Sequence, residues 1–163
     1  MVNCVADFIN SDFINTDRPA VIFFDGIKSI NNPKKNMSFN ELFLFSKKSQ
    51  ALLKNMGLEK GDTVLLFEKP VPDLYGFIIG ALGLGVKLLV VEPWMPGKHF
   101  DSILKKHRPK ALMAGTLGRI VLKKSVEIKK VANRFSMDDV RSINSTDEFH
   151  LEDLEEGSPA LVS

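Results

Sequence analysis

Three glycines in one apolar stretch are the residues of this sequence most readily compared with a ligand-binding motif. They are Gly80, Gly83 and Gly85, spaced Gly-x-x-Gly-x-Gly, whereas the dinucleotide-binding loop has the spacing Gly-x-Gly-x-x-Gly. That loop follows a strand and opens a helix, so that free backbone amides at the helix start bind phosphate. Here the glycines end an apolar helical segment and enter an apolar strand. We therefore predict that they serve packing and turn geometry.

The histidines and the cysteine offer little metal chemistry. No two of His99, His107 and His150 are spaced as a ligand pair on one helical turn, although His99 and His107 can share a helix face. Cys4 is the only cysteine, which excludes an internal disulfide and a cysteine metal site. We expect the histidines to lie at the surface and assign no metal ligand.

The paired acids and the tryptophan are the remaining polar or aromatic candidates. The pairs Asp138-Asp139 and Glu155-Glu156 lie in a polar segment, whereas catalytic carboxylates need a cleft that shifts one pKa. Trp94 follows the end of a predicted strand, where ligands bind in α/β folds, but a half-buried loop anchor is its more ordinary role. No serine lies in a nucleophile elbow. We assign no catalytic and no cofactor-binding residue.

The stretch from Phe77 to Pro93 organises the elements around these residues. Its first half is apolar nearly all round, which favours a helix buried against a sheet and ended by Gly83 and Gly85. Residues 86–91 form an almost unbroken apolar run, which favours a strand covered on both faces. Pro93 closes this strand because it cannot donate to a ladder.

The rest of the pattern alternates between strands and helices. Strands are predicted at residues 19–24, 63–67 and 110–114, with 140–143 and 159–162 as further candidates. Helices are predicted within 2–15, at 38–56, at 72–84, at 98–107 after a loop at 94–97, and at 116–123. This order predicts an α/β fold with a mostly parallel sheet, helices on both faces and right-handed crossovers, in a single domain of residues 1–163.

Three segments are less regular. Asp25-Gly26 predicts a hairpin turn, with residues 27–30 as the return arm and 31–36 as a polar loop. Residues 125–135 fit a strand or a helix equally well. Residues 145–157 form an acidic connector with one helical turn at 151–154.

Composition and charge are those of an ordinary globular protein. The chain has 163 residues, of which 44% are hydrophobic and 26% charged, and no apolar run reaches the ~20 residues that span a bilayer. The N-terminus lacks the features of a signal peptide, so we expect a cytoplasmic setting. The net charge of +2 divides unevenly: residues 138–163 hold eight acids and one base, and the rest carries +9. The paired lysines suggest solvated helix faces, and without interleaved aromatic residues we expect no nucleic-acid partner.

Two motifs in the first half of the chain resemble one enzyme family. Met37-Ser38-Phe39-Asn40-Glu41-Leu42 is similar to the Ser/Thr-Tyr-x-Glu-Leu of adenylate-forming synthetases, the AMP-binding family of acyl-CoA synthetases and their relatives. A second motif, Leu53-x-x-Met56-Gly57-Leu58-x-x-Gly61-Asp62-x-Val64, resembles that family's Leu-x-x-x-Gly-Val-x-x-Gly-Asp-x-Val. Phe39 stands where the family has tyrosine.

Two further segments follow in the family's order, over about 140 residues in all. Gly80-Ala81-Leu82-Gly83-Leu84-Gly85-Val86, running to Glu92-Pro93, resembles Ala-Leu-x-Ala-Gly-Ala…Pro-Leu-Asn/Asp-Pro. Gly157-Ser158-Pro159-Ala160-Leu161-Val162 resembles the Asp-Asp-Pro-Ala-Leu-Ile that precedes the family's phosphate loop. Lys87 and Glu92 depart from the pattern.

The resemblance implies the N-terminal third of an ATP-dependent, AMP-forming acid–thiol ligase. Such an enzyme uses a carboxylic acid (a fatty acid among the candidates), ATP with Mg²⁺, and a thiol such as CoA. The family's phosphate loop would begin just after Ser163, so we expect residues 1–163 alone to be inactive and to hold no cofactor. We also expect them to self-associate through the truncated face, where apolar surface normally covered by the rest of the enzyme is exposed. The alternative is a complete, non-catalytic α/β binding or interaction module.

Overall fold

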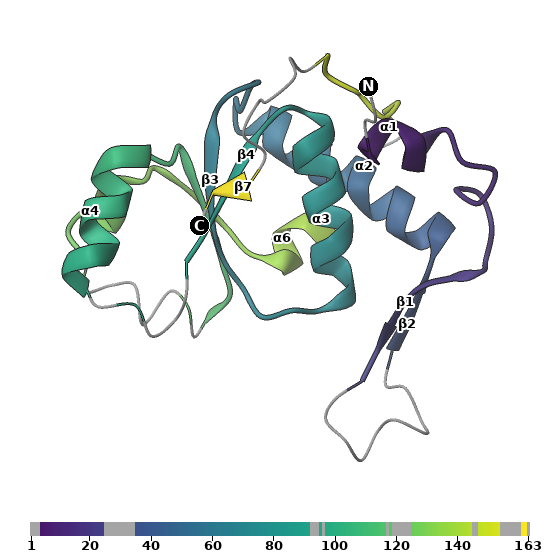
Figure 1. The fold of residues 1–163 in the computed structure, drawn as a ribbon, viewed down its shortest axis with the longest axis horizontal. Helices are drawn as coiled ribbons and strands as arrows, with labels where there is room; N and C mark the ends of the chain where they lie inside the picture. The colour runs from purple at the N-terminus through teal and green to yellow at the C-terminus, as the bar shows by residue number, and fades with distance from the viewer. Residues whose placement is uncertain are drawn as a thin grey trace.

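A five-stranded parallel sheet forms the centre of the protein (Figure 1). The computed structural model describes residues 4–24, 35–91, 95, 97–116, 118, 125–144, 147–153 and 161–162. The strand order is β6-β5-β3-β4-β7. The strands are β3 (Thr63–Phe67), β4 (Lys87–Val90), β5 (Ala111–Ala114), β6 (Asn133–Phe135) and β7 (Leu161–Val162), and all neighbouring pairs are parallel.

Helices cover both faces of this sheet, as predicted. On one face lie α2 (Phe39–Asn55), α3 (Pro72–Gly83) and α6 (Met137–Ser142). Their apolar side chains pack with Val64, Leu66 and Leu88 in one cluster. On the other face α4 (Gly97–His107) and the short 3₁₀ helix η2 (Ile128–Lys130) pack with Leu65 and Leu89 in a second cluster. Alternate residues of each strand thus serve opposite faces, because side chains alternate along a strand.

The strand predicted at residues 86–91 is β4, and it is an interior strand. It pairs with β3 on one side, where Leu88 lies opposite Val64, and with β7 on the other. Leu88 and Leu89 are both 0% exposed. The nearly continuous apolar sequence is explained by burial on both faces.

The start of α2 also agrees with the prediction. The Ser38 hydroxyl accepts a hydrogen bond from the Glu41 amide at 3.2 Å, and the Ser38 amide donates to Glu41 Oε2 at 2.8 Å. This reciprocal pair is a capping box, which satisfies two backbone donors that the helix leaves free. The helix ends just before Gly57, which has a φ of 71°, a backbone conformation that favours glycine.

The N-terminal hairpin departs from the prediction in its return arm. Strand β1 (Pro19–Phe23) pairs antiparallel with β2 (Lys35–Ser38), so that Val21 lies opposite Met37. Part of the predicted polar loop 31–36 is therefore strand, and the expected arm at 27–30 lies outside the described residues. Residues 35–38 are too polar to show the alternating pattern of a half-buried strand, and pairing with β1 decides their conformation. The hairpin forms a separate two-stranded sheet and extends away from the main sheet (Figure 1).

The end of the chain corrects two more predictions. Residues 140–143 are not a strand; residues up to Ser142 belong to α6, which starts at a second capping box between Ser136 and Asp139. The fourth strand is instead β6, inside the segment 125–135 that pattern alone left open. Residues 147–153, which we call the strap, contact α2 at Phe43 and Gln50 and the end of α3 at Gly83. They have no helical structure, so the turn expected from residue 151 is absent as far as Asp153.

Helix α1 (Cys4–Ile9) accounts for part of the helical segment predicted within residues 2–15. Of the helix predicted at 116–123, the structure describes Thr116 and Gly118, and both are helical. Among the described residues, none of the helices is long and apolar enough to cross a membrane.

Candidate functional site

The carboxyl ends of β3 and β5 meet at a place where parallel sheets commonly bind ligands. From β3 the chain passes to β4 on one side, then crosses back to β5 on the other side of β3. The chain therefore leaves the end of β3 toward β4 and leaves the end of β5 toward β6, in opposite directions, and ligands of open α/β sheets bind where the connections diverge in this way. The residues that follow these two strands form the candidate site.

Glu68 and Gly115 are the residues that follow β3 and β5. A Cβ atom added to Gly115 would lie 3.0 Å from Glu68 Oε2, so the glycine allows the carboxylate to lie over the end of β5. Glu68 Oε1 accepts a hydrogen bond from the Lys69 amide at 3.0 Å. The side chain is half-buried.

A second glycine brings the next segment against β3. A Cβ atom on Gly118 would lie 2.8 Å from Phe67 Cδ1 and 3.1 Å from the Phe67 carbonyl oxygen. Gly115 and Gly118 thus follow a strand and enter helical backbone, which is the order that phosphate-binding loops use. Here a carboxylate occupies the position in front of the helix start, and this favours a cationic or hydrogen-bond-donating ligand group over a phosphate.

The first turn of α3 adds an ion pair to the same edge. Arg141 Nε lies 2.6 Å from Asp73 Oδ2, Arg141 Nη2 also contacts that oxygen, and Arg141 Nη1 lies 2.5 Å from Asp138 Oδ1. Burial lowers the pKa of Arg141, but hydrogen bonds to Asp73 and Asp138 outweigh it and raise the pKa above its usual value. Because Asp73 is buried, this guanidinium holds α6 against α3.

The glycines of the apolar stretch have the packing roles that we predicted. A Cβ atom on Gly80 would lie 2.5 Å from the Ser46 carbonyl oxygen, so α2 and α3 approach backbone to backbone. A Cβ on Gly83 would lie 2.5 Å from Phe149 Cζ. Gly85 has a φ of 72° in the turn into β4.

The other candidates occupy separate positions in the described structure. His99 lies on the exposed surface of α4, His107 ends that helix, and His150 lies in the strap. Asp139 caps α6 through the Ser136 amide. Within the described part of the chain, no group of three or more His, Cys, Asp and Glu side chains can hold a metal ion. Trp94 and the pair Glu155-Glu156 lie outside the described residues.

Sequence reasoning did not single out Glu68, Gly115 or Gly118. The available signal was a glycine directly after an apolar strand, at Gly115. The contact with Glu68 has no local signal, because it depends on β3 and β5 being neighbours although β4 separates them in the sequence.

The sequence matches the family described as "AMP-binding enzyme" over residues 14–160. The chain belongs to that family. A search of curated proteins gave no match.

Solved structures of adenylate-forming enzymes share the fold. The N-terminal subdomain of NpsA from Klebsiella oxytoca, in complex with 3-hydroxybenzoyl-AMSN, has a TM-score of 0.72 and 19% identity over 99% of this chain and 37% of its own. A fatty acyl CoA synthetase from Mycobacterium tuberculosis has a TM-score of 0.67 and 17% identity over 78% of this chain and 26% of its own. O-succinylbenzoate coenzyme A synthetase (MenE) from Bacillus subtilis, unliganded, has a TM-score of 0.63 and 18% identity, covering 83% and 26%. The chain thus spans about a quarter to a third of these structures.

One of the motifs that carried the resemblance, around Gly57 and Asp62, connects three elements of the fold. Asp62 Oδ2 accepts hydrogen bonds from the Glu59 amide at 2.8 Å and from Lys110 Nζ at 2.7 Å. Lys110 Nζ also donates to the Gly57 carbonyl at 2.6 Å. The Gly-x-x-x-Gly-Asp motif therefore ties the end of α2 to the starts of β3 and β5. Residues 157–160 lie outside the described residues, and Leu161 and Val162 form β7.

Proposed function

We propose that residues 1–163 are the N-terminal scaffold of an AMP-forming acid–thiol ligase, about one third of its AMP-binding domain. The observation that carries this proposal is the family match over residues 14–160. The parallel sheet and its helices supply the framework, and β7 is the strand that leads toward the position of the family's phosphate loop.

The proposed reaction has two steps. A carboxylate oxygen attacks the α-phosphorus of ATP, forming an acyl-adenylate and releasing pyrophosphate. A thiol then attacks the acyl carbon, forming a thioester and releasing AMP. Mg²⁺ would neutralise the triphosphate charge in the first step. A MenE structure is described as a complex with ATP and magnesium ion, which supports ATP and Mg²⁺ as cofactors. Another neighbour is described as a fatty acyl CoA synthetase, which supports an acyl acid as substrate and CoA as acceptor. These substrates support a cytoplasmic setting.

The 163-residue chain alone should not perform this chemistry. Nucleotide phosphates need converging backbone amides together with a lysine or a metal ion. At the strand-to-helix junction after β5, the Glu68 carboxylate opposes an anion. We therefore propose no catalytic, cofactor-binding or metal-binding residue within this scaffold.

Two measurements test the proposal. Reading the gene beyond Ser163 should reveal a Ser/Thr/Gly-rich loop ending in lysine, and the encoded protein should catalyse acid-dependent exchange of labelled pyrophosphate into ATP. Calorimetric titration of residues 1–163 with ATP and Mg²⁺ should give no saturable binding in the micromolar range. A stop codon after Ser163 together with saturable binding would instead support the complete binding module.

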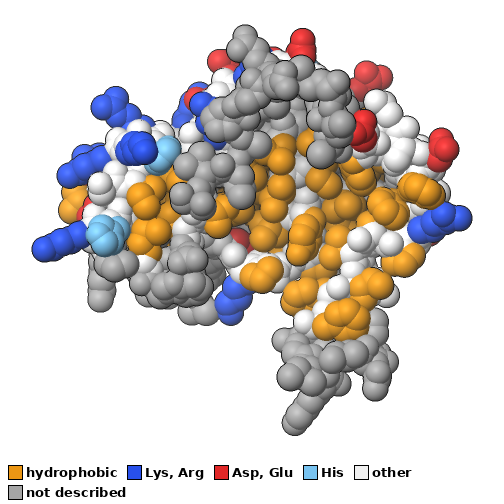
Figure 2. All heavy atoms as spheres, viewed as in Figure 1, with side chains coloured by type: hydrophobic (Ala, Val, Ile, Leu, Met, Phe, Trp, Pro, Cys, Tyr) orange, Lys and Arg blue, Asp and Glu red, His pale blue; other side chains and the backbone are white. Residues whose placement is uncertain are grey.

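The outer surface of α3 supports self-association of this chain. Tyr75 is 48% exposed, Ile22 and Phe24 of the hairpin region are 50% and 42% exposed, and Figure 2 shows hydrophobic side chains gathered over α3 and toward the hairpin. Large exposed apolar surfaces favour association. Light scattering after size-exclusion chromatography should give a mass above the monomer's 18.2 kDa that falls on dilution, and a concentration-independent monomer would refute this.

A further inference from the structure

The strap, residues 147–153, is held to the helices by a buried side-chain amide. Gln50 of α2 is 2% exposed. Its Nε2 donates to the His150 carbonyl at 2.6 Å, and its Oε1 accepts from the His150 amide at 2.8 Å. Gln50 therefore pairs with both backbone groups of His150, as a neighbouring strand would. The same Nε2 also donates to the Gly80 carbonyl at 3.2 Å, so Gln50 joins the strap to α3 as well.

Phe149 occupies the space that a side chain at position 83 would need. Its ring lies over Gly83, where an added Cβ would come within 2.5 Å of Cζ and 2.7 Å of Cε1. The same ring lies 5.8 Å, centroid to centroid, from Phe43 of α2. The strap is thus anchored by packing as well as by hydrogen bonds.

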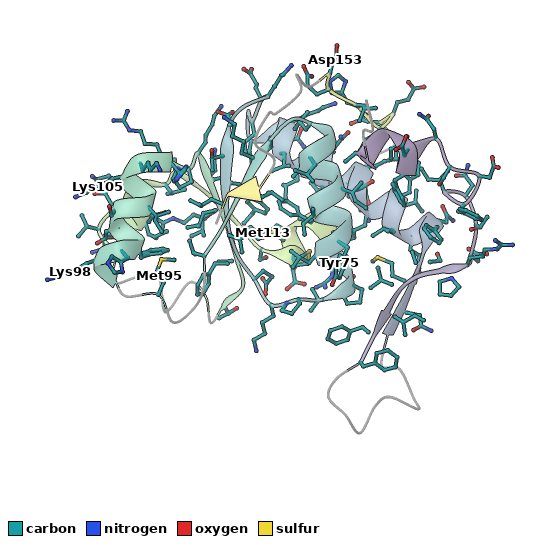
Figure 3. The ribbon with its side chains drawn as sticks, viewed as in Figure 1. Tyr75, Met95, Lys98, Lys105, Met113 and Asp153 are labelled. Carbon is teal, nitrogen blue, oxygen red and sulfur yellow. The ribbon has the colours of Figure 1, made fainter. Side chains whose placement is uncertain are left out.

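Further contacts follow toward the end of the strap. The Glu152 amide donates to the Gly83 carbonyl at 2.7 Å. Lys60 Nζ donates to the Asp153 carbonyl and lies 3.5 Å from Glu152 Oε1. Asp153 lies at the side of the molecule where α3 ends (Figure 3). This is the amino edge of the sheet, because β4 begins there, and β7 runs from this edge beside β4.

We propose that the strap is a conformational clamp that keeps β7 docked on β4. With the strap bound, residues 154–160 separate the last anchor from β7; with it released, residues 143–160 separate α6 from β7. Because β7 has two residues and a single described neighbour, its docking depends on how closely it is tethered. The free-energy cost of closing a loop grows as 1.5 RT times the logarithm of the number of residues in it. Lengthening the tether from residues 154–160 to residues 143–160 therefore predicts a roughly fourfold decrease in the equilibrium constant for docking of β7.

The clamp also has a consequence that rests on the proposed function. If the phosphate loop follows β7, the strap at the amino edge controls a loop at the opposite, carboxyl edge. Releasing the strap in the longer protein should raise KM for ATP while β3 and β5 keep their structure.

Two variants release the strap from different sides. Gln50→Leu removes the pairing with His150, and Gly83→Ala displaces Phe149. Gly97→Ala is the matched control, because an added Cβ there has no neighbour within 4 Å. The measurement is hydrogen exchange in the 163-residue chain of whichever of the Leu161 and Val162 amides points toward β4, since successive strand amides point to opposite sides, relative to the Leu65 and Leu112 amides of the central strands.

The exchange ratio decides the proposal. We expect both strap variants to raise exchange at that β7 amide about fourfold or more relative to the central strands, and Gly97→Ala to leave the ratio unchanged. An unchanged ratio in both strap variants, whatever happens to overall stability, would overturn the clamp. This readout needs no nucleotide, so its failure is distinct from failure of the proposed function.

Discussion

At the scale of single residues, the contact between Arg141 and Asp73 is an ion pair with unequal exposure. The Asp73 side chain is 3% exposed and that of Arg141 46%. Taking a guanidinium away from a buried carboxylate is costly because water cannot replace it fully. The second partner of Arg141 is Asp138, whose side chain is 86% exposed. Ion pairs with such exposed groups contribute little to stability.

Arg141→Met should therefore lower the free energy of unfolding by about 2–4 kcal/mol. This loss is somewhat smaller than the loss on breaking a fully buried ion pair, because Arg141 is half-exposed. Asp138→Asn should change it by less than about 0.5 kcal/mol. Urea unfolding followed by circular dichroism measures both. Similar losses for the two variants would contradict the central role of Asp73.

The glycines of α3 give a graded test of close helix packing. A Cβ at Gly80 would meet the Ser46 carbonyl oxygen at 2.5 Å, whereas at Gly76 the closest atoms are in Phe45 at 3.0 Å and the Leu42 carbonyl oxygen lies at 3.1 Å. The shorter distance to a backbone atom at Gly80 requires the larger shift of one helix against the other. Gly80→Ala should cost about 3 kcal/mol and Gly76→Ala about 1 kcal/mol. Thermal unfolding of both variants should show this order, and the reverse order would argue against a backbone-to-backbone approach of α2 and α3.

At the scale of elements, the start of α2 is stabilised by its capping box. Ser38→Ala removes the acceptor for the Glu41 amide and should destabilise the protein by about 1 kcal/mol. Ser38→Asp should retain most of this stability, because its carboxylate can accept the same bond. Denaturant midpoints of the two variants check the prediction, and equal losses would assign the effect to something other than capping.

The strap should weaken in acid. The hydrogen bond from His150 is the largest cause that lowers the pKa of Glu152, and Lys60 adds to it. The pKa of Glu152 in the folded protein lies below the unfolded value of 4.5. The stability that Glu152 contributes through these contacts is therefore present above about pH 4.5 and is lost as pH falls through the folded pKa. NMR shifts of the His150 and Glu152 amides should move in that window, and Glu152→Gln should abolish the movement.

Elements with strong local signals were predictable from the sequence. The apolar runs of β3, β4 and β5 and the Ser38–Glu41 capping box identified the central sheet and its longest helix. Residues 140–143 were misassigned because only Val140 and Ile143 supported a strand, and the capping box between Ser136 and Asp139, which starts α6, was not recognised in the sequence. The strap could not be foreseen, because Gln50 and His150 are 100 residues apart. Glu68 and Gly115 were missed for the same reason, since their contact exists only in the folded sheet.

At the scale of the whole molecule, charge is separated between opposite parts of the fold. Lys98, Lys105 and Lys106 are exposed on α4, and Figure 2 shows lysine, arginine and histidine side chains gathered at that end. The strap and α6 carry most of the described acids of the C-terminal segment. Interactions between exposed charges weaken with salt, so the proposed self-association should persist at about 0.5 M NaCl if it is apolar.

The strand order has a consequence for folding during synthesis. Strand β4 pairs with one side of β3. Strand β5 then pairs with the other side of β3, and β6 pairs with β5, so these two strands extend the sheet on the side away from β4. The last strand, β7, returns to the opposite side, beside β4. About 70 residues separate β4 from β7, and at 5–20 residues per second the ribosome needs roughly 4–14 s to make them. For that time the edge of β4 presents unpaired backbone N–H and C=O groups, which can pair with another chain, so a nascent chain is open to aggregation at this edge until β7 is made.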